Sequence, residues 1–120
     1  MDSKPRIYLI DDDAAVCDAL SIFLEVCGYS VDVFRSSGAF LEQADEIKRG
    51  VLVLDMRLPG MSGIELQTEL RKRRIDMPVI FITGHGDEDL RESVMQDGAM
   101  DFLEKPIDHR VLLKRIEAAR

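Results

Sequence analysis

The sequence predicts an α/β fold, a five-stranded parallel sheet in the order 2-1-3-4-5 with five helices around it. Two observations lead to this prediction. Five short apolar runs alternate along the chain with longer segments of helical periodicity, a pattern typical of parallel sheets that are covered by helices on both faces. Three of the runs are apolar throughout and two are not, and this difference indicates which strands lie at the edges of the sheet.

The predicted strands are residues 7–10, 31–34, 51–54, 79–82 and 102–103. The first, third and fourth are continuously apolar, as expected for strands that are buried on both faces. The second reads VDVF and alternates, and the fifth is short, so both suit edge positions. The resulting order is that of a doubly wound, flavodoxin-like sheet, in which ligands bind at the carboxyl ends of the first and third strands.

Helices are expected between the strands. The first has an apolar stripe and ends at Gly28, a residue type that favours a helix C-terminus. The stripe consists of Val16, Leu20, Phe23, Leu24 and Cys27. Weaker stripes predict the other helices around residues 40–47, 66–70, 90–94 and 112–119. The basic run 71–74 follows the third of these helices, where cations suit the negative end of the helix dipole; contact with a partner is the alternative.

Composition and charge exclude several classes of function. The 120 residues suffice for one domain with its own core. The formal net charge of −7 argues against direct nucleic-acid binding, which needs a basic face. No apolar run approaches the roughly 20 residues that span a bilayer, so we expect a cytoplasmic location without membrane contact. Cys17 and Cys27 lack metal-ligand spacing and are expected to be reduced packing residues.

Polar residues stand at the carboxyl ends of four predicted strands, and parallel strands bring these ends to one rim of the sheet. They are Asp11, Asp12 and Asp13 after the first strand, Asp55 after the third, Thr83 after the fourth and Lys105 after the fifth. Neighbouring carboxylates repel one another, so a helix N-terminus, a cation or solvent must offset the repulsion. Asp13 either caps the first helix or ligates a metal, but a cap explains only one of the acids.

The same residues supply the parts for phosphoryl transfer, in which a protein mainly positions groups and neutralises charge. Clustered carboxylates form the hard-oxygen pocket that Mg²⁺ occupies. Asp55 is the best candidate nucleophile, because it is central and isolated from other acids in the sequence, and carboxylates form acyl phosphates. Lys105 offers a point charge for a phosphate oxygen, and Thr83 offers a hydroxyl donor.

Four motifs in the right order and spacing resemble the receiver domain of two-component response regulators. They are DDD, LDMRLPGMSGIEL, ITGHGD and GAMDFLEKP. The resemblance covers essentially all 120 residues and is strongest to the FixJ type, which is usually joined to a helix-turn-helix DNA-binding output domain. It implies that residues 1–120 form one receiver domain, that the output domain lies outside this chain, and that the domain is a phosphoacceptor switch rather than a turnover enzyme.

The resemblance also implies roles for individual residues. Asp55 would accept a phosphoryl group from a phosphohistidine of a sensor histidine kinase. Mg²⁺ would be held by Asp12, Asp55 and the backbone carbonyl of Arg57, with Asp11 assisting through water. Thr83 and Lys105 would bind the phosphoryl oxygens.

Phosphorylation is then expected to switch a surface. Phe102 matches an aromatic switch position that moves together with Thr83, and the Lys105–Pro106 bond matches one that is cis in the family. The fourth helix, fifth strand and fifth helix would form the surface, which could also form a phosphorylation-dependent homodimer. Its candidate contacts are Val94, Met95, Phe102 and Leu113.

Three alternatives compete with this interpretation. A Mg²⁺-dependent phosphohydrolase of the haloacid dehalogenase type would also use Asp55, but it needs a second acid two residues later, where Arg57 stands. A degenerate receiver would bind partners without phosphorylation, but all the expected residues are present. A nucleotide-binding domain would carry a GxGxxG or GxxxxGK[ST] loop, and the sequence has neither in the required place.

Overall fold

The computed structural model describes residues 4–47, 49–84 and 88–119. Five strands and five helices alternate along these residues, as the periodicity predicted. The elements are β1 (Ile7–Ile10), α1 (Ala14–Val26), β2 (Val31–Phe34), α2 (Ser37–Ala44), β3 (Val51–Asp55), α3 (Gly63–Lys72), β4 (Val79–Thr83), α4 (Glu88–Gln96), β5 (Asp101–Glu104) and α5 (His109–Ala118).

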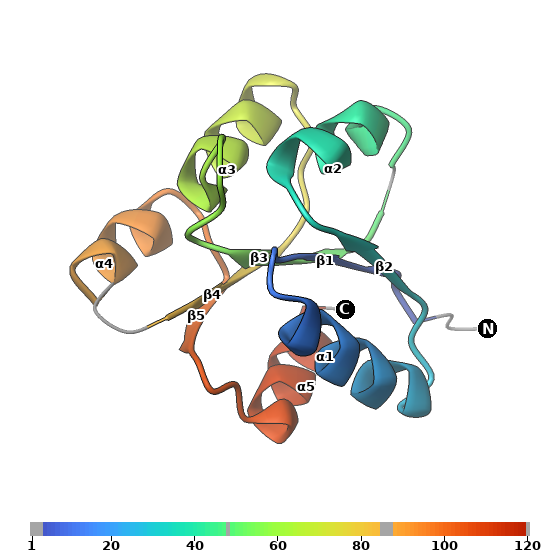
Figure 1. The fold of residues 1–120 in the computed structure, drawn as a ribbon. Helices are drawn as coiled ribbons and strands as arrows, with labels where there is room; N and C mark the ends of the chain where they lie inside the picture. The colour runs from blue at the N-terminus through green and yellow to red at the C-terminus, as the bar shows by residue number, and fades with distance from the viewer. Residues whose placement is uncertain (1–3, 48, 85–87, 120) are drawn as a thin grey trace.

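The strands form one parallel sheet in the predicted order, β2-β1-β3-β4-β5. Helices α1 and α5 cover one face of the sheet, and α2, α3 and α4 cover the other (Figure 1). β3 and β4 each run one residue further than predicted, so Asp55 and Thr83 are their last residues and not the residues after them. This extension follows from the pairing, because Asp55 lies opposite Ile82 and Thr83 lies opposite Glu104.

Alternate residues of the central strands supply the two halves of the core. In β1, Ile7 and Leu9 pack under α1 and α5, whereas Tyr8 and Ile10 pack under the helices of the other face. All four residues are buried. The continuous apolar runs therefore mark strands that are covered on both sides, which is the reason the sequence located the sheet correctly.

The helix ends agree with the local sequence. Asp13 caps α1, and its carboxylate accepts hydrogen bonds from the amides of Ala15 and Val16. Gly28 follows the end of α1 with φ +95°, a conformation that glycine adopts without strain. Ser62 and Glu65 form a capping box at the start of α3.

Gly63 lies where two segments come too close for any side chain. A β-carbon at this position would overlap the carbonyl oxygen of Asp55 and lie 3.0 Å from the Cα of Met56. The amide of Gly63 donates a hydrogen bond to the Met56 carbonyl at 3.0 Å. The first turn of α3 is therefore packed directly against the end of β3.

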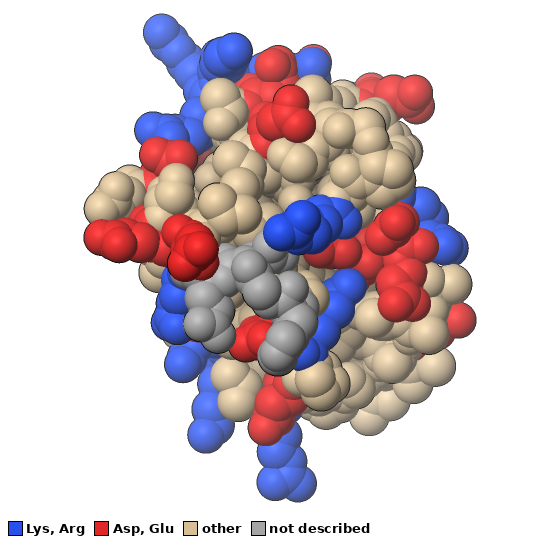
Figure 2. Space-filling view, turned by 60° about the vertical axis from the view of Figure 1, so that its left-hand side comes forward, with Lys and Arg blue, Asp and Glu red and all other residues tan. Residues whose placement is uncertain are grey.

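The surface carries both signs of charge. On the face drawn in Figure 2, acidic and basic side chains lie next to one another. Within the described residues, no helix is long and apolar enough to cross a bilayer.

Candidate functional site

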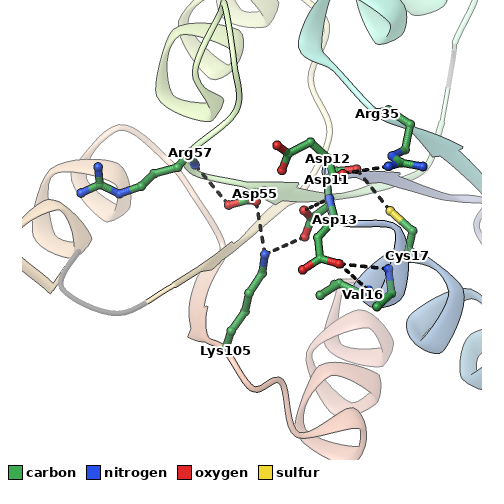
Figure 3. A network of polar contacts seen from close by, with 10 residues as sticks. Asp11, Asp12, Asp13, Val16, Cys17, Arg35, Asp55, Arg57 and Lys105 are labelled. Carbon is green, nitrogen blue, oxygen red and sulfur yellow. Dashed lines mark hydrogen bonds and ion pairs between the residues drawn. The ribbon is translucent and has the colours of Figure 1, made fainter.

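Strand pairing brings the first and third strand ends together. Ile10 lies opposite Leu54, so the following residues, Asp11 and Asp55, extend side by side from neighbouring strands (Figure 3). Both carboxylates are almost completely buried, with Asp11 0% and Asp55 4% exposed. Asp12 is exposed and completes the group, because carboxylate oxygens of Asp11, Asp12 and Asp55 all lie within 4.8 Å of one another.

Asp13 does not belong to this group of three acids. Its carboxylate is the N-cap of α1, which decides between the two roles that the sequence left open. Its backbone amide donates a hydrogen bond at 2.9 Å to Oδ1 of Asp11. Asp13 therefore ends the loop between β1 and α1, and its amide helps to orient the Asp11 carboxylate.

Lys105 is the basic residue that contacts the buried acids. Its Nζ lies 2.9 Å from Oδ2 of Asp11 and 3.3 Å from Oδ2 of Asp55, so one ammonium bridges the two buried acids. The Lys105 amide donates a hydrogen bond at 2.7 Å to the carbonyl of Thr83, which ties the segment after β5 to the end of β4. The next peptide bond, Lys105–Pro106, is cis.

The electrostatics of Asp55 are dominated by its burial. The pKa of Asp55 is raised to about 6, mainly because the carboxylate is buried; the Arg57 amide and Lys105 lower this pKa, and the charge of nearby Asp11 raises it. Burial also lowers the pKa of Lys105, but its hydrogen bond to Asp11 and the charges of Asp55 and Asp11 outweigh this effect and leave that pKa raised. The site therefore holds more negative charge than one lysine neutralises.

The other predicted residues lie around this centre. Thr83 is 1% exposed at the end of β4, and the backbone amide of Arg57 donates a hydrogen bond at 3.1 Å to Oδ1 of Asp55. Phe102 is 7% exposed, and its ring packs in the core on the side of α4. The ITGHGD motif continues into residues 85–87, which lie outside the described residues.

Two supporting residues were not predicted from the sequence. The Arg35 guanidinium donates a hydrogen bond at 2.8 Å to the carbonyl of Asp12, and the Cys17 thiol donates one at 3.2 Å to the carbonyl of Asp11. Burial raises the pKa of Cys17 to about 11, which suits a thiol that donates and does not react. A signal for Arg35 existed, since it directly follows the second predicted strand at the rim that carries the acids.

This donor set fits a hard divalent cation. Three carboxylates from two adjacent strand ends offer oxygen ligands at close range, and these are the ligands that Mg²⁺ takes while it retains waters. Sulfur and imidazole ligands, which softer metals prefer, are absent from the group.

Comparisons with known proteins agree with the geometry. Residues 7–117 match the family described as the response regulator receiver domain. The chain is 41% identical over 119 residues to the transcriptional regulatory protein FixJ of Bradyrhizobium diazoefficiens, covering 99% of this chain and 58% of that protein. It is 42% identical over 118 residues to the response regulator protein TodT of Pseudomonas putida, covering 98% and 52%. The chain therefore spans about half the length of these curated relatives.

Solved structures show the same likeness. The crystal structure of FixJ-N superposes with a TM-score of 0.90 at 39% identity, covering 99% of this chain and 94% of that one. Full-length FixJ from B. japonicum gives a TM-score of 0.92 at 41% identity, covering 98% and 58%.

Proposed function

Because this chain belongs to the response regulator receiver domain family, we propose that Asp55 is its phosphoacceptor and a phosphohistidine of a sensor histidine kinase is the donor. The observation that carries this proposal is the position of Asp55. Its carboxylate is buried at the end of the central strand, beside two other acids and within 3.3 Å of the Lys105 ammonium. Such a constellation neutralises and orients a phosphoryl group, which is most of what phosphoryl transfer requires.

The proposed step forms one bond and breaks one. A carboxylate oxygen of Asp55 attacks phosphorus while the bond between phosphorus and the imidazole nitrogen of the donor breaks, and the imidazole keeps the bonding electrons and takes up a proton. Asp55 becomes an acyl phosphate. Lys105 then exchanges its contact with the Asp55 carboxylate for one with a phosphoryl oxygen, and the Thr83 hydroxyl donates to another.

Mg²⁺ is the proposed cation of the site. Asp12, Asp55 and the Arg57 carbonyl would hold it directly, and Asp11 would hold it through water. When bound, it would neutralise charge on the phosphoryl oxygens. The excess of acids over Lys105 supports this assignment, because it leaves negative charge for a cation to offset.

The proposed output is a change of the surface formed by α4, β5 and α5, with Thr83 and Phe102 as the switch. Of the predicted contacts, Met95 is 36% exposed and Leu113 is partly buried. Val94 and Phe102 are 0% and 7% exposed and belong to the core, so their assignment as surface contacts was wrong: Val94 of α4 and Phe102 of β5 both lie in the apolar layer between α4 and the sheet.

The proposal extends to partners outside this chain. FixJ and TodT are regulators of about twice this length. We therefore propose that a helix-turn-helix output domain lies outside residues 1–120 and that this domain, not the acidic receiver domain, binds DNA. The switched surface would also form a phosphorylation-dependent homodimer. The kinase partner and the transcriptional output imply a cytoplasmic location.

Acetyl phosphate and Mg²⁺ test the proposal without the kinase. Intact-mass spectrometry should show one added phosphoryl group on the wild-type chain and none on Asp55→Asn. Asp18→Asn removes an exposed acid from α1 and should still be phosphorylated. Phosphorylation of Asp55→Asn to the wild-type level would refute the assignment, and rapid turnover of diverse phosphomonoesters would favour the hydrolase instead.

A further inference from the structure

Asp11, Asp12 and Asp13 form the loop between β1 and α1, which we call the acid loop, and the backbone carbonyl of each accepts a hydrogen bond from a different donor group. The Asp11 carbonyl accepts from the Cys17 thiol at 3.2 Å, and the Asp13 carbonyl accepts from the Cys17 amide at 3.1 Å. Both donors belong to α1, the helix that the loop itself begins. The Asp12 carbonyl accepts from Arg35 at 2.8 Å, the only partner found for it in the described part of the chain.

Arg35 reaches the loop because of the strand register. Ile10 lies opposite Phe34 at the ends of β1 and β2, and the Asp11 amide donates a hydrogen bond at 3.1 Å to the Phe34 carbonyl. Arg35 is the next residue, and its side chain extends along the rim to the Asp12 carbonyl (Figure 3). It thereby ties the exposed middle of the acid loop to a different element, the segment between β2 and α2.

The charge and the hydrogen bond of Arg35 have opposite effects on a bound cation. A guanidinium beside three acids repels an incoming cation, but Arg35 is exposed, so solvent and salt screen this repulsion. Its hydrogen bond has a charged donor, and such bonds are roughly twice as strong as neutral ones. The positioning effect should therefore exceed the repulsion.

We propose that Arg35 is a positioning residue of the cation site, which holds the Asp12 backbone so that the acid loop is ordered before the cation binds. This inference rests on the proposed Mg²⁺ site. The positioning role and a simple charge effect predict opposite changes in cation affinity when Arg35 is replaced. Loss of its hydrogen bond should weaken cation binding, whereas loss of its positive charge alone should strengthen it.

Titration calorimetry with Mg²⁺ on three variants tests the inference. Arg35→Met removes both the charge and the donor, and should weaken Mg²⁺ binding by about tenfold, the lower end of what supporting residues around a metal contribute. Arg35→Lys keeps a charged donor and should restore most of the affinity. Arg6→Met is the matched control: it removes an exposed arginine, paired with Asp32 at 3.2 Å, from the opposite end of the same strand pair. It should bind Mg²⁺ as the wild type does.

Each result decides the matter. Binding by Arg35→Met that is unchanged or tighter than in the wild type would overturn the positioning role, and so would an equal loss in Arg6→Met. Wild-type protein that binds no Mg²⁺ would overturn the proposed metal site together with this inference, so the two failures are distinguishable.

Discussion

Leu54 and Asp55 are consecutive residues of β3, and both are almost completely withdrawn from solvent. The Leu54 side chain gains free energy from burial, because it leaves water for a packed apolar core. The Asp55 carboxylate loses free energy, because burial disfavours its charged form. The same strand therefore stabilises the fold along its length and destabilises it at its last residue, which is the proposed phosphoacceptor.

The two contributions are of similar size. Removing a buried leucine side chain typically costs about 2–5 kcal/mol. The pKa of Asp55 is raised from 3.8 to about 6, which corresponds to at most roughly 3 kcal/mol of lost stability at neutral pH. A single apolar residue thus offsets the cost of the buried acid, and mutations at the two positions should have opposite signs.

The largest expected effect is on the apolar side of this comparison. Leu54→Ala should lower the free energy of unfolding by about 2–5 kcal/mol, because it leaves a cavity in the core. Urea denaturation measures it. Val33→Ala, at a position 41% exposed on the edge strand β2, should cost less than about 1 kcal/mol. Similar losses in the two variants would contradict the assignment of Leu54 to the core.

Replacing the buried acid should change the free energy of unfolding in the opposite direction. Asp55→Asn should raise the free energy of unfolding at pH 7.5 by up to about 3 kcal/mol without Mg²⁺, because it removes a buried charge.

The pH dependence follows from the same shift. Above about pH 6, Asp55 is ionised in both the folded and the unfolded chain, and the cost of burying its charge is present in full. Below pH 3.8 it is protonated in both, and the cost is gone. The Asp55 contribution to stability therefore rises as the pH falls between these values. The gain from Asp55→Asn should shrink over the same range, and a gain independent of pH would contradict the raised pKa.

Mg²⁺ should reduce the cost of the acids in the wild type. At 100 times the dissociation constant, a cation that binds only the folded chain stabilises it by about 2.7 kcal/mol. Thermal denaturation should show a higher Tm in Mg²⁺ than in the same ionic strength of NaCl. The shift should be smaller in Asp55→Asn, which lacks one of the proposed ligands. Equal shifts in the two proteins would indicate that the ion binds elsewhere.

The smallest expected effect separates capping from metal binding. Asp13→Ala should lower the free energy of unfolding by about 1 kcal/mol, the usual value of an N-cap. The Tm shift caused by Mg²⁺ should remain, because the Asp13 backbone amide still donates to Asp11. Loss of that shift would place Asp13 among the ligands.

The strand order and the proximity of Asp11, Asp12 and Asp55 were predictable from the sequence for the same reason. Both depend on the backbone path, which the apolar periodicity of strands such as 51–54 and 79–82 reveals. The choice between capping and ligation for Asp13 was not predictable, because it depends on which way a carboxylate turns. Arg35 was missed, and Val94 was wrongly assigned to the surface, for similar reasons: the reach of a long side chain and the buried face of a short helix are set by packing between distant segments.

The close packing at Gly63 restricts how Asp55 can move. The first turn of α3 occupies the space behind the Asp55 carbonyl, and no atom could be added there. If Asp55 is phosphorylated as proposed, its main chain has no room to move toward α3. We therefore expect any displacement of Asp55 to pass to the opposite side, through Lys105 and Thr83 into β4 and β5. The absence of a side chain at Gly63 would then determine the direction of the structural change.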